Sequence, residues 1–386
     1  MFHIAIKPQP YKDPWIATFA ERKAGLRGGK LSVAYFYETP DTSTFRYRVY
    51  NMIQVLRNSH SEISASFFCN EDIKNLREII EIADVLVFCR TRYNAKIDQA
   101  ITLAKRKGKK VFFDVDDLIF DTTNTYLILN TLDQDLNHPN VWDFWFAYIS
   151  RIGETLKLCD AAITTNDYLA QRIHKFVNIP VHIIPNFLNA EQLDISNQLF
   201  QNKKSSKFAR TNNLQLGYFS GTPTHNKDFS ILTSALVELF ETRPEVSLTV
   251  VGFMDITGEL NKYKSRIQLY PLHDFINLQR IIAHVEINLV PLQDNVFTNC
   301  KSELKYFEAA ITGTLTIATP TYTYANSIKE GFNGYLSKSY EWFEKIDSVI
   351  DNMQLYPELA ENGYKQVKLK YGWQYQKDLI EQVLSS

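Results

Sequence analysis

Lys301 and two acids, Glu303 and Glu308, follow a polar turn in the segment "NVFTNCKSELKYFEAA", which covers residues 295–310. The pattern predicts a helix that begins near Thr298–Lys301, where unpaired backbone N–H groups and the helix dipole favour a bound phosphate. Lys301 adds a positive charge where a purely structural helix would prefer an acid. Glu308 lies two turns further along the same face, and its carboxylate could accept hydrogen bonds from sugar hydroxyls. A solvated helix face of Lys and Glu is the alternative, and this segment alone favours it.

A second segment suited to an anion is "LGYFSGTPTHNKDFSIL", residues 216–232. It predicts a strand, a turn that contains Gly221 and Thr222, and a helix that begins near Asp228 and follows Lys227. The alternative is an ordinary strand–helix loop capped by Asp228. The segment has neither a Walker lysine motif nor a spaced G-x-G-x-x-G, so the usual nucleotide fingerprints are missing. Two anion-suited loops in one half of the chain are harder to dismiss than either alone.

Four aspartates stand at the end of a predicted strand in "VFFDVDDLIFD", residues 111–121. Asp114, Asp116, Asp117 and Asp121 could bind Mg²⁺ or Mn²⁺ through oxygen, orient sugar hydroxyls, or cap the next turn. The D-x-D spacing does not separate these alternatives.

Two arginines and one asparagine complete the candidate residues of the first half. Arg46 and Arg48 open the helix after the first strand, and they could meet a phosphate bidentately or pair with a nearby acid such as Glu38 or Asp41. Asn186 follows a proline at the end of a strand, which by itself indicates only a turn.

The composition describes a globular chain of two domains. It has 386 residues, and a chain of that length is too long for one ordinary core. Apolar residues make up 45% of it, as expected of a globular protein. Lys plus Arg (42) balance Asp plus Glu (43), so nothing favours a nucleic-acid partner. The four cysteines lie far apart and predict a reduced, cytoplasmic chain without zinc. We expect no transmembrane helix and no signal peptide.

The elements that must position these residues alternate along the chain. Short apolar runs separated by amphipathic helices predict parallel strands at 31–38, 63–68, 84–90, 109–115, 161–165 and 181–186, and again at 214–221, 246–252, 267–271, 287–292 and 314–320. We therefore expect two Rossmann-like, doubly wound α/β domains that face each other across a cleft, with ligands at the carboxyl ends of the strands.

The predicted boundaries divide the chain into five parts. Residues 31–196 form the first domain, 197–213 a polar linker, 214–370 the second domain, and 371–386 a helix that returns to the first domain. Residues 1–30 form a basic arm. The arm could touch an anionic membrane surface, on the inner face of the cell membrane, or pack on its own domain, and the sequence leaves both open.

In their order along the chain these motifs resemble the GT-B glycosyltransferases, in particular the large retaining family 4. "CDAAITTNDYLAQRI…IIPN" resembles the end of the family's first domain, and "KSELKYFEAAITGTLTIATPTYTYANSIKEGFNGYL" its E-x7-E region and Gly loop. Lys227 stands at the position of the family's diphosphate-contacting lysine. The chain departs from the family at Cys300, which replaces the first Glu of E-x7-E, since Glu303 does not hold that spacing. Asp116 stands where many members have His.

The resemblance implies transfer of a sugar from a nucleotide-diphosphate donor to a glycan or lipid-linked acceptor, with retention and without a metal or other cofactor. The implied catalytic residues are Asp116, Lys227, Lys301 and Glu308. The implied donor contacts are Gly221, Thr222, Lys227, Tyr270, Pro291, Asn299, Cys300, Lys301, Ser302, Glu303 and Glu308. On the acceptor side of the cleft we expect Arg46, Arg48, Asp114, Asp117 and Asn186.

Three alternatives stay open at this point. The first is a metal-dependent transferase that uses the "DVD" aspartates. The second is a catalytically silent module that binds a sugar nucleotide or a glycan. The reason for this alternative is the missing first Glu of the E-x7-E pattern. The third, an epimerase or phosphorylase of the same fold, is favoured by no particular residue.

Overall fold

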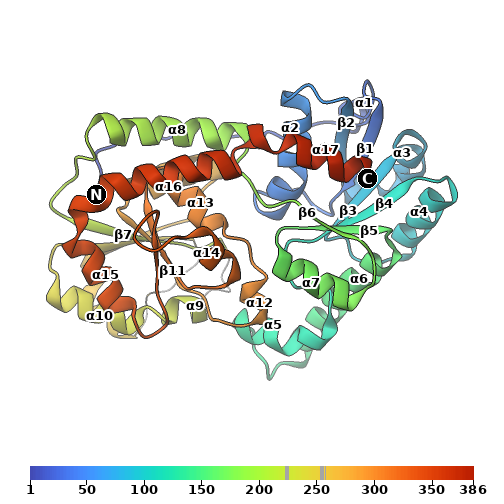
Figure 1. Cartoon of the computed structure of the whole chain (residues 1–386). Helices are drawn as coiled ribbons and strands as arrows, with labels where there is room; N and C mark the ends of the chain where they lie inside the picture. The colour runs from blue at the N-terminus through green and yellow to red at the C-terminus, as the bar shows by residue number, and fades with distance from the viewer. Residues whose placement is uncertain (222–225, 253–255, 257) are drawn as a thin grey trace.

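The computed structural model describes residues 1–221, 226–252, 256 and 258–386, which form two α/β domains (Figure 1). The first domain contains a parallel six-stranded sheet in the order β2-β1-β3-β4-β5-β6. Its strands are β1 (Leu31–Phe36), β2 (Ile63–Phe68), β3 (Val85–Cys89), β4 (Lys110–Asp114), β5 (Ala161–Thr164) and β6 (Val181–Ile183).

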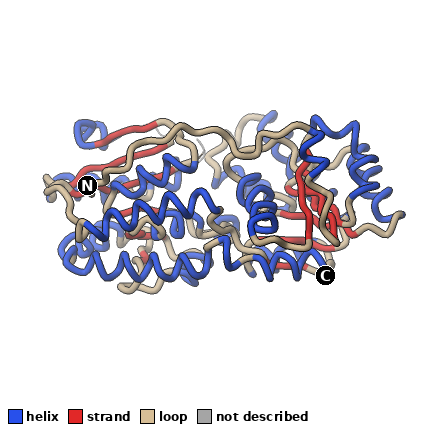
Figure 2. The backbone as a smooth tube through the Cα atoms, turned by 90° about the horizontal axis from the view of Figure 1, so that it is seen from above, coloured by secondary structure: helices blue, strands red, loops and turns tan. Residues whose placement is uncertain are grey.

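The second domain contains its own parallel six-stranded sheet in the order β12-β11-β10-β7-β8-β9. Its strands are β7 (Leu214–Phe219), β8 (Val246–Val251), β9 (Ile267–Tyr270), β10 (Ile287–Val290), β11 (Leu315–Ala318) and β12 (Tyr335–Leu336). Figure 2 shows the two groups of strands at opposite ends of the elongated molecule. The predicted architecture of two doubly wound domains is confirmed.

Helices connect and cover the strands of both sheets. In the first domain they are α1 (Phe19–Ala24), η1 (Arg46–Tyr50), α2 (Asn51–Asn58), η2 (Asn70–Asn75), α3 (Leu76–Ile82), α4 (Ala95–Arg106), η3 (Thr122–Asn124), α5 (Thr125–Thr131), α6 (Pro139–Leu158) and α7 (Asp167–Phe176). From residue 190 onward they are α8 (Ala190–Ser205), α9 (Asn226–Ser230), α10 (Thr233–Thr242), η5 (Gly258–Arg266), α11 (Phe275–His284), α12 (Val296–Asn299), α13 (Leu304–Ala310), α14 (Tyr322–Ser327), α15 (Trp342–Asp351), η6 (Met353–Leu355), α16 (Tyr356–Tyr371), η7 (Trp373–Tyr375) and α17 (Lys377–Ser385).

Burial explains why the apolar runs become central strands. Every residue of β3 is buried, as expected for a parallel strand covered by helices on both faces. The following helix, α4, starts at Asn94, whose side chain accepts hydrogen bonds from the backbone N–H groups of Lys96 and Ile97. One face of α4 packs into the core while its charged face is exposed, so each strand–helix unit places its connecting loop at the edge of the sheet.

The predicted linker over 197–213 is wrong in its first half. Residues 197–205 continue α8, a helix of 16 residues that packs on α11. Its polar composition reflects one exposed face, whereas Leu193, Leu199 and Phe200 on the other face are buried. At the far end of the chain, α17 lies against α2 of the first domain (Figure 1), and Ser61 Oγ donates to Glu381 Oε1 at 2.5 Å.

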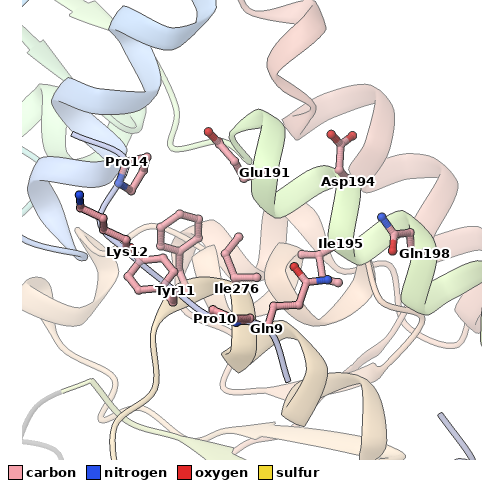
Figure 3. A pocket seen from close by; sticks show the side chains of 11 residues that line it. Gln9, Pro10, Tyr11, Lys12, Pro14, Glu191, Asp194, Ile195, Gln198 and Ile276 are labelled. Atoms are coloured by element: carbon pink, nitrogen blue, oxygen red, sulfur yellow. The ribbon is translucent and has the colours of Figure 1, made fainter. Parts of the chain in front are cut away.

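The N-terminal arm packs on its own protein over much of its length. The Phe2 N–H donates to the His284 carbonyl at 3.0 Å, and Trp15 is buried against Phe45 and Tyr50. Where the arm crosses α8 and α11 it borders a hollow of about 300 Å³ (Figure 3), and no residue that lines this hollow is among the predicted site residues.

Several cations of the arm are paired with acids of the first domain: Arg22 with Asp72, Lys23 with Glu78, and Lys30 with Glu62. Within the described part of the chain, no helix combines the length and the apolar character that crossing a membrane requires.

Candidate active site

A cavity of about 310 Å³ lies between the two domains, at the carboxyl ends of their strands. From the first domain it is lined by Thr42, Ser43, Thr44, Arg46, Tyr47, Arg90, Asp116, Asp117 and Asn186. From the second domain it is lined by Phe219, Ser220, Gly221, Val251, Leu272, His273, Phe275, Leu278, Leu292, Lys301, Ser302, Leu304, Lys305, Glu308 and Tyr324. Part of the wall is therefore apolar, and the rest carries convergent charges from both domains, as is common in ligand sites.

The predicted helix of residues 298–310 is broken in the structure. α12 ends at Asn299, α13 begins at Leu304, and the residues between them form a non-helical connection. Asn295 caps α12 through its hydrogen bond from the Thr298 N–H, so the first turn belongs to a separate short helix. The break brings Lys301 and Ser302 to the cavity ahead of the first turn of α13.

Two lysines from this region border the cavity. The Lys301 ammonium lies 3.7 Å from Asp117 Oδ2 across the cleft. Lys305 is half-buried, its ammonium lies 5.3 Å from the centre of the Tyr218 ring, and burial, with a smaller effect of Lys301, lowers its pKa to about 8. The sequence prediction missed Lys305, because it assumed one continuous helix and the break before Leu304 changes which side chains face the cavity.

Glu308 joins the two domains. Its Oε1 atom accepts hydrogen bonds from Arg46 Nη2 at 3.3 Å, Tyr47 Oη at 2.5 Å and Gln192 Nε2 at 2.9 Å. The Arg46 guanidinium also lies between two rings, 4.0 Å from the centre of Tyr47 and 4.7 Å from that of Phe275. Glu308 is only 5% exposed, so its charge is balanced mainly by the first domain.

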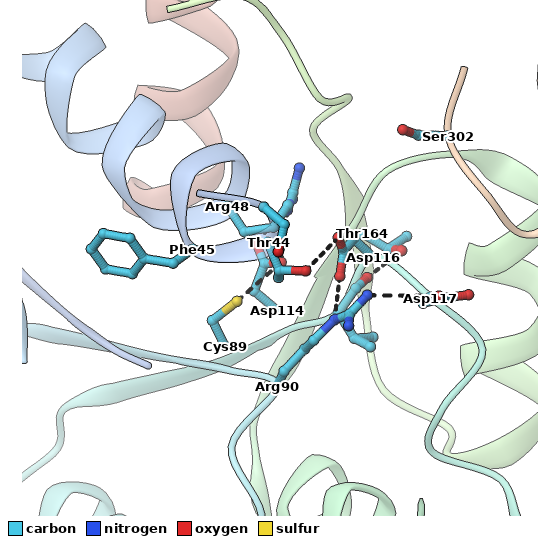
Figure 4. Close-up of polar contacts among 12 residues, drawn as sticks. Thr44, Phe45, Arg48, Cys89, Arg90, Asp114, Asp116, Asp117, Thr164 and Ser302 are labelled. Atoms are coloured by element: carbon cyan, nitrogen blue, oxygen red, sulfur yellow. Dashed lines mark hydrogen bonds and ion pairs between the residues drawn. The ribbon is translucent and has the colours of Figure 1, made fainter. Parts of the chain in front are cut away.

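The strand-end aspartates meet an arginine at the other wall (Figure 4). Arg90 Nε lies 2.5 Å from Asp116 Oδ1, and Arg90 Nη2 lies 3.7 Å from Asp117 Oδ2. Thr44 Oγ1 donates to Asp116 Oδ2 at 3.4 Å. Among the described residues, no group of three His, Cys, Asp or Glu side chains has a geometry that could hold a metal ion.

Residues 200–366 match the family model described as "Glycosyl transferases group 1". The protein is a glycosyltransferase. Its fold is that of HepE from Anabaena, solved with UDP and glucose, with 14% identity, a TM-score of 0.57, and coverage of 92% of this chain and 99% of HepE. No curated protein matches the chain in sequence.

Two other solved structures share the fold of this glycosyltransferase. Sucrose-phosphate synthase from Thermosynechococcus elongatus is 12% identical with a TM-score of 0.59, covering 91% of this chain and 96% of its own. A glycosyltransferase from Rickettsia africae is 15% identical with a TM-score of 0.59, covering 92% and 97%. At these identities the likeness extends to the GT-B fold alone.

Two residues predicted for the acceptor side of the transferase do not reach the cavity. Arg48 and Asp114 are buried in the first domain, where Arg48 Nε and Nη2 donate to the two carboxylate oxygens at 2.8 and 2.9 Å. Arg48 Nη1 also donates to the Ile184 carbonyl at 2.7 Å, so this arginine holds β4 and the end of β6 together. Asn186 does line the cavity, and its Nδ2 donates to Ser302 Oγ at 3.0 Å.

Four residues predicted for the donor side of the transferase also do not line the cavity. The Lys227 ammonium instead donates to the Asn130 carbonyl at 2.8 Å, because α9 packs toward α5. Tyr270 ends the edge strand β9 and is 39% exposed, and Pro291 is buried just ahead of the lining residue Leu292. Asn299 Oδ1 accepts a hydrogen bond from the Tyr322 N–H at 2.7 Å. Gly221 borders the cavity as predicted for the donor loop, and Thr222 lies outside the described residues.

Neither Cys300 nor Glu303 supplies the acid that the E-x7-E pattern lacks. Cys300 is fully buried and burial raises the pKa of its thiol, so no anion stands at that position at neutral pH. Glu303 points away from the cavity, where its carboxylate accepts hydrogen bonds from Tyr371 and Ser327. Of the predicted residues in this segment, Lys301, Ser302 and Glu308 line the cavity.

Proposed function

We propose that this glycosyltransferase moves a sugar from a nucleotide-diphosphate donor that binds in the cavity between its domains. The observation that carries the proposal is the convergence of Lys301, Lys305 and the first turn of α13 on one wall. Two ammonium groups beside the start of a helix, where the first backbone N–H groups lack partners within the helix, form a site for a diphosphate. The same segment lies inside the part of the chain that matches the group 1 model.

The lysines would act on the leaving group. When the bond between the sugar and the diphosphate breaks, negative charge grows on the diphosphate, and Lys301 and Lys305 stabilise it electrostatically. Asp116 and Asp117 are already paired with Arg90, which favours a role in orienting the sugar or acceptor hydroxyls over metal binding. The proposed reaction is therefore metal-independent, and full activity in EDTA is expected.

Other residues of the cavity suit the base and the ribose of the donor. Phe219, Leu272, Leu278 and Leu292 offer apolar surface for the base. By the family resemblance, Glu308 faces the ribose. HepE was solved with UDP, so UDP is the first nucleotide to test. A glycan or lipid-linked acceptor, retention of configuration, and a place in surface polysaccharide or glycoconjugate synthesis in the cytoplasm or at the inner face of the membrane follow from the resemblance.

A thermal-shift panel with UDP, GDP, ADP and dTDP tests the proposal, because a ligand that binds the folded state raises the Tm. We expect one nucleotide to raise the Tm of the wild type, and Lys301→Ala and Lys305→Ala to reduce that rise. Lys157→Ala is the matched control, since Lys157 pairs with Glu154 near the carboxyl end of α6 and does not line the cavity. The proposal is wrong if no nucleoside diphosphate raises the Tm of the wild type.

Turnover separates binding from chemistry. Release of nucleoside diphosphate from the matching nucleotide sugar is expected to fall at least about tenfold in each cavity-lysine variant, the effect of losing about 1.4 kcal/mol of transition-state stabilisation. Turnover like that of the wild type in both variants would remove these lysines from the mechanism.

A further inference from the structure

The aromatic stretch of α6 lies mostly on the surface. The sequence "VWDFWFAYI" (141–149) suggests an element of the core or the cleft, but only Ile149 is fully buried. Phe144 and Phe146 are 58% and 51% exposed, and Tyr126 of neighbouring α5 is 61% exposed. Together with Trp142 and Tyr148, these residues flank the exposed side of α6, and we call the set the aromatic shelf.

The rings of the aromatic shelf form two ridges. Tyr126 and Trp142 stack at 6.4 Å with an angle of 26°, and Phe144 and Tyr148 stack at 6.1 Å with an angle of 20°. At 100° per residue, Asp143 and Ala147 lie between the two ridges on the exposed side of α6. An open hollow of about 470 Å³ lies on this side, lined by Trp142, Asp143, Phe146, Ala147 and Ser150.

The charge around the shelf selects among possible occupants. Residues 121–150, which carry α5 and the first part of α6, include four Asp and no Lys or Arg. Of the two arginines beside the shelf, Arg92 is paired with Glu38, and Arg151 donates to the Tyr93 carbonyl. An anionic membrane or a phosphate-rich polymer would be repelled, since such surfaces are recognised by clustered cations. An uncharged sugar chain fits better, because its C–H faces pack on the negative faces of aromatic rings and its hydroxyls donate to carboxylates such as Asp143.

Arg92 links the Tyr148 end of the shelf to the chain segment that carries the cavity residue Arg90. The Arg92 guanidinium lies 5.6 Å from the centre of the Tyr148 ring, and its Nε atom donates to Glu38 Oε1 at 3.0 Å and to Glu38 Oε2 at 2.9 Å. Two residues earlier, Arg90 lines the cavity beside Asp116. A chain of sugars lying along Phe144 and Tyr148 would therefore meet the paired side chains of Arg92 and Glu38, and beyond them the cavity.

The carboxyl end of α5 touches the second domain, where Figure 1 shows α5 beside α12. Gln293 Nε2 donates to the Thr131 carbonyl at 3.2 Å, and Asn295 Nδ2 donates to Thr131 Oγ1 at 3.1 Å. The helix pair that carries the shelf is thus held at the cleft by both domains.

We propose that the aromatic shelf binds an uncharged oligosaccharide, the part of the acceptor next to the hydroxyl that receives the sugar, and leads its end past Arg92 into the cavity. This inference rests on the proposed function, because an acceptor is needed only if a sugar is transferred. It narrows the acceptor from a glycan or lipid-linked compound to one with at least a short uncharged glycan outside the cavity.

The test measures binding of the full-length protein to immobilised uncharged oligosaccharides of glucose, galactose, mannose and N-acetylglucosamine. We expect the wild type to bind at least one of them and Phe144→Ala/Tyr148→Ala and Trp142→Ala/Phe146→Ala to bind it at least about tenfold more weakly. Tyr340→Ala is the matched control, because Tyr340 is 72% exposed on the second domain, and its binding should be unchanged. The inference is wrong if the wild type binds none of these glycans or if the shelf variants bind like the wild type.

One further measurement distinguishes a glycan from a lipid or a second copy of the protein as the occupant of the shelf. Another tests the proposed function independently of the shelf. Binding to phosphatidylcholine vesicles, or self-association in sedimentation, that is lost in the shelf variants while glycan binding persists would overturn the inference in favour of a lipid or a second copy. The Tm rise with UDP, or with the nucleotide that the panel identifies, should persist in every shelf variant. Its absence in all proteins, the wild type included, would count against the proposed function, and the glycan result would still decide whether the shelf binds sugars.

Discussion

Two arginines that stand two positions apart in η1 have different partners. Arg46 crosses the boundary between the domains and meets Glu308, 262 positions away in the sequence. Arg48 stays inside the first domain and meets Asp114 through two hydrogen bonds. Both arginines are buried, so burial alone does not tell a residue that lines the cavity from one that supports the core.

The difference indicates what each pair can do. A charge pair within one domain is present whenever that domain is folded, so it contributes to stability and not to ligand binding. A pair between the domains exists only when the domains are close together, so it couples their approach to the cavity that they enclose. The expected effects of substitution therefore separate stability from donor turnover.

The largest expected effect is on stability. Arg48→Ala would leave the buried Asp114 carboxylate unpaired, and we expect the free energy of unfolding to fall by about 3–5 kcal/mol. Urea denaturation measures this loss. Arg243→Ala is the control, because Arg243 pairs with Asp347 and Asp351 near the surface and should cost about 1 kcal/mol or less. A loss below about 1 kcal/mol in Arg48→Ala would show that the Arg48–Asp114 pair contributes no more to stability than the surface pairs of Arg243.

The next effect is on turnover. Glu308→Gln should lower nucleoside diphosphate release from the donor by about 10–100-fold, since about 1.4–2.7 kcal/mol of transition-state stabilisation is lost. Arg46→Ala should act in the same direction and cost less stability than Arg48→Ala. Because the two side chains touch, Arg46→Ala/Glu308→Gln should be hardly worse than the more affected single variant. Fully additive losses would mean that Arg46 does not act through Glu308.

A smaller effect concerns pH and Lys305. With its pKa lowered to about 8, Lys305 loses most of its charge by pH 9, so affinity for the nucleoside diphosphate should fall by up to about tenfold between pH 7 and 9. Titration calorimetry at both pH values measures the change, and Lys305→Arg should flatten it because arginine stays charged.

Stability of the unliganded protein should change in the opposite direction. The unfolded chain holds the Lys305 proton up to a pH near 10.5, the folded chain only to about 8, so the contribution of Lys305 to stability rises with pH over that interval. An affinity that does not change with pH in the wild type would place the Lys305 ammonium away from the diphosphate.

The smallest effect is expected at the other contact between the domains. Lys227→Ala removes the hydrogen bonds of the ammonium to Asn130 and its 3.7 Å approach to Asp133, which are partly exposed. Turnover should fall less than about threefold, in contrast with Lys301→Ala and Lys305→Ala, because exposed contacts of this kind contribute about 0.2–1 kcal/mol. A large loss would return Lys227 to the donor site, where the family resemblance places it.

The sequence was sufficient for the architecture because the signals are local. Apolar runs of five or six residues, helix caps such as Asn94, and polar turns recur in an order that only a parallel sheet with crossover helices satisfies. It was insufficient at α8, because a helix with one buried face among many polar residues resembles a linker in composition.

The two doubly wound domains, and the polar segments at the ends of their strands, could therefore be predicted from the amino-acid pattern alone. Which side chains share the cavity became visible only in the folded chain: Lys305 with Lys301, and Arg46 rather than Arg48. Arg46 and Gln192 meet Glu308 from 262 and 116 positions away, and contacts at such separations leave no periodic pattern in the local sequence.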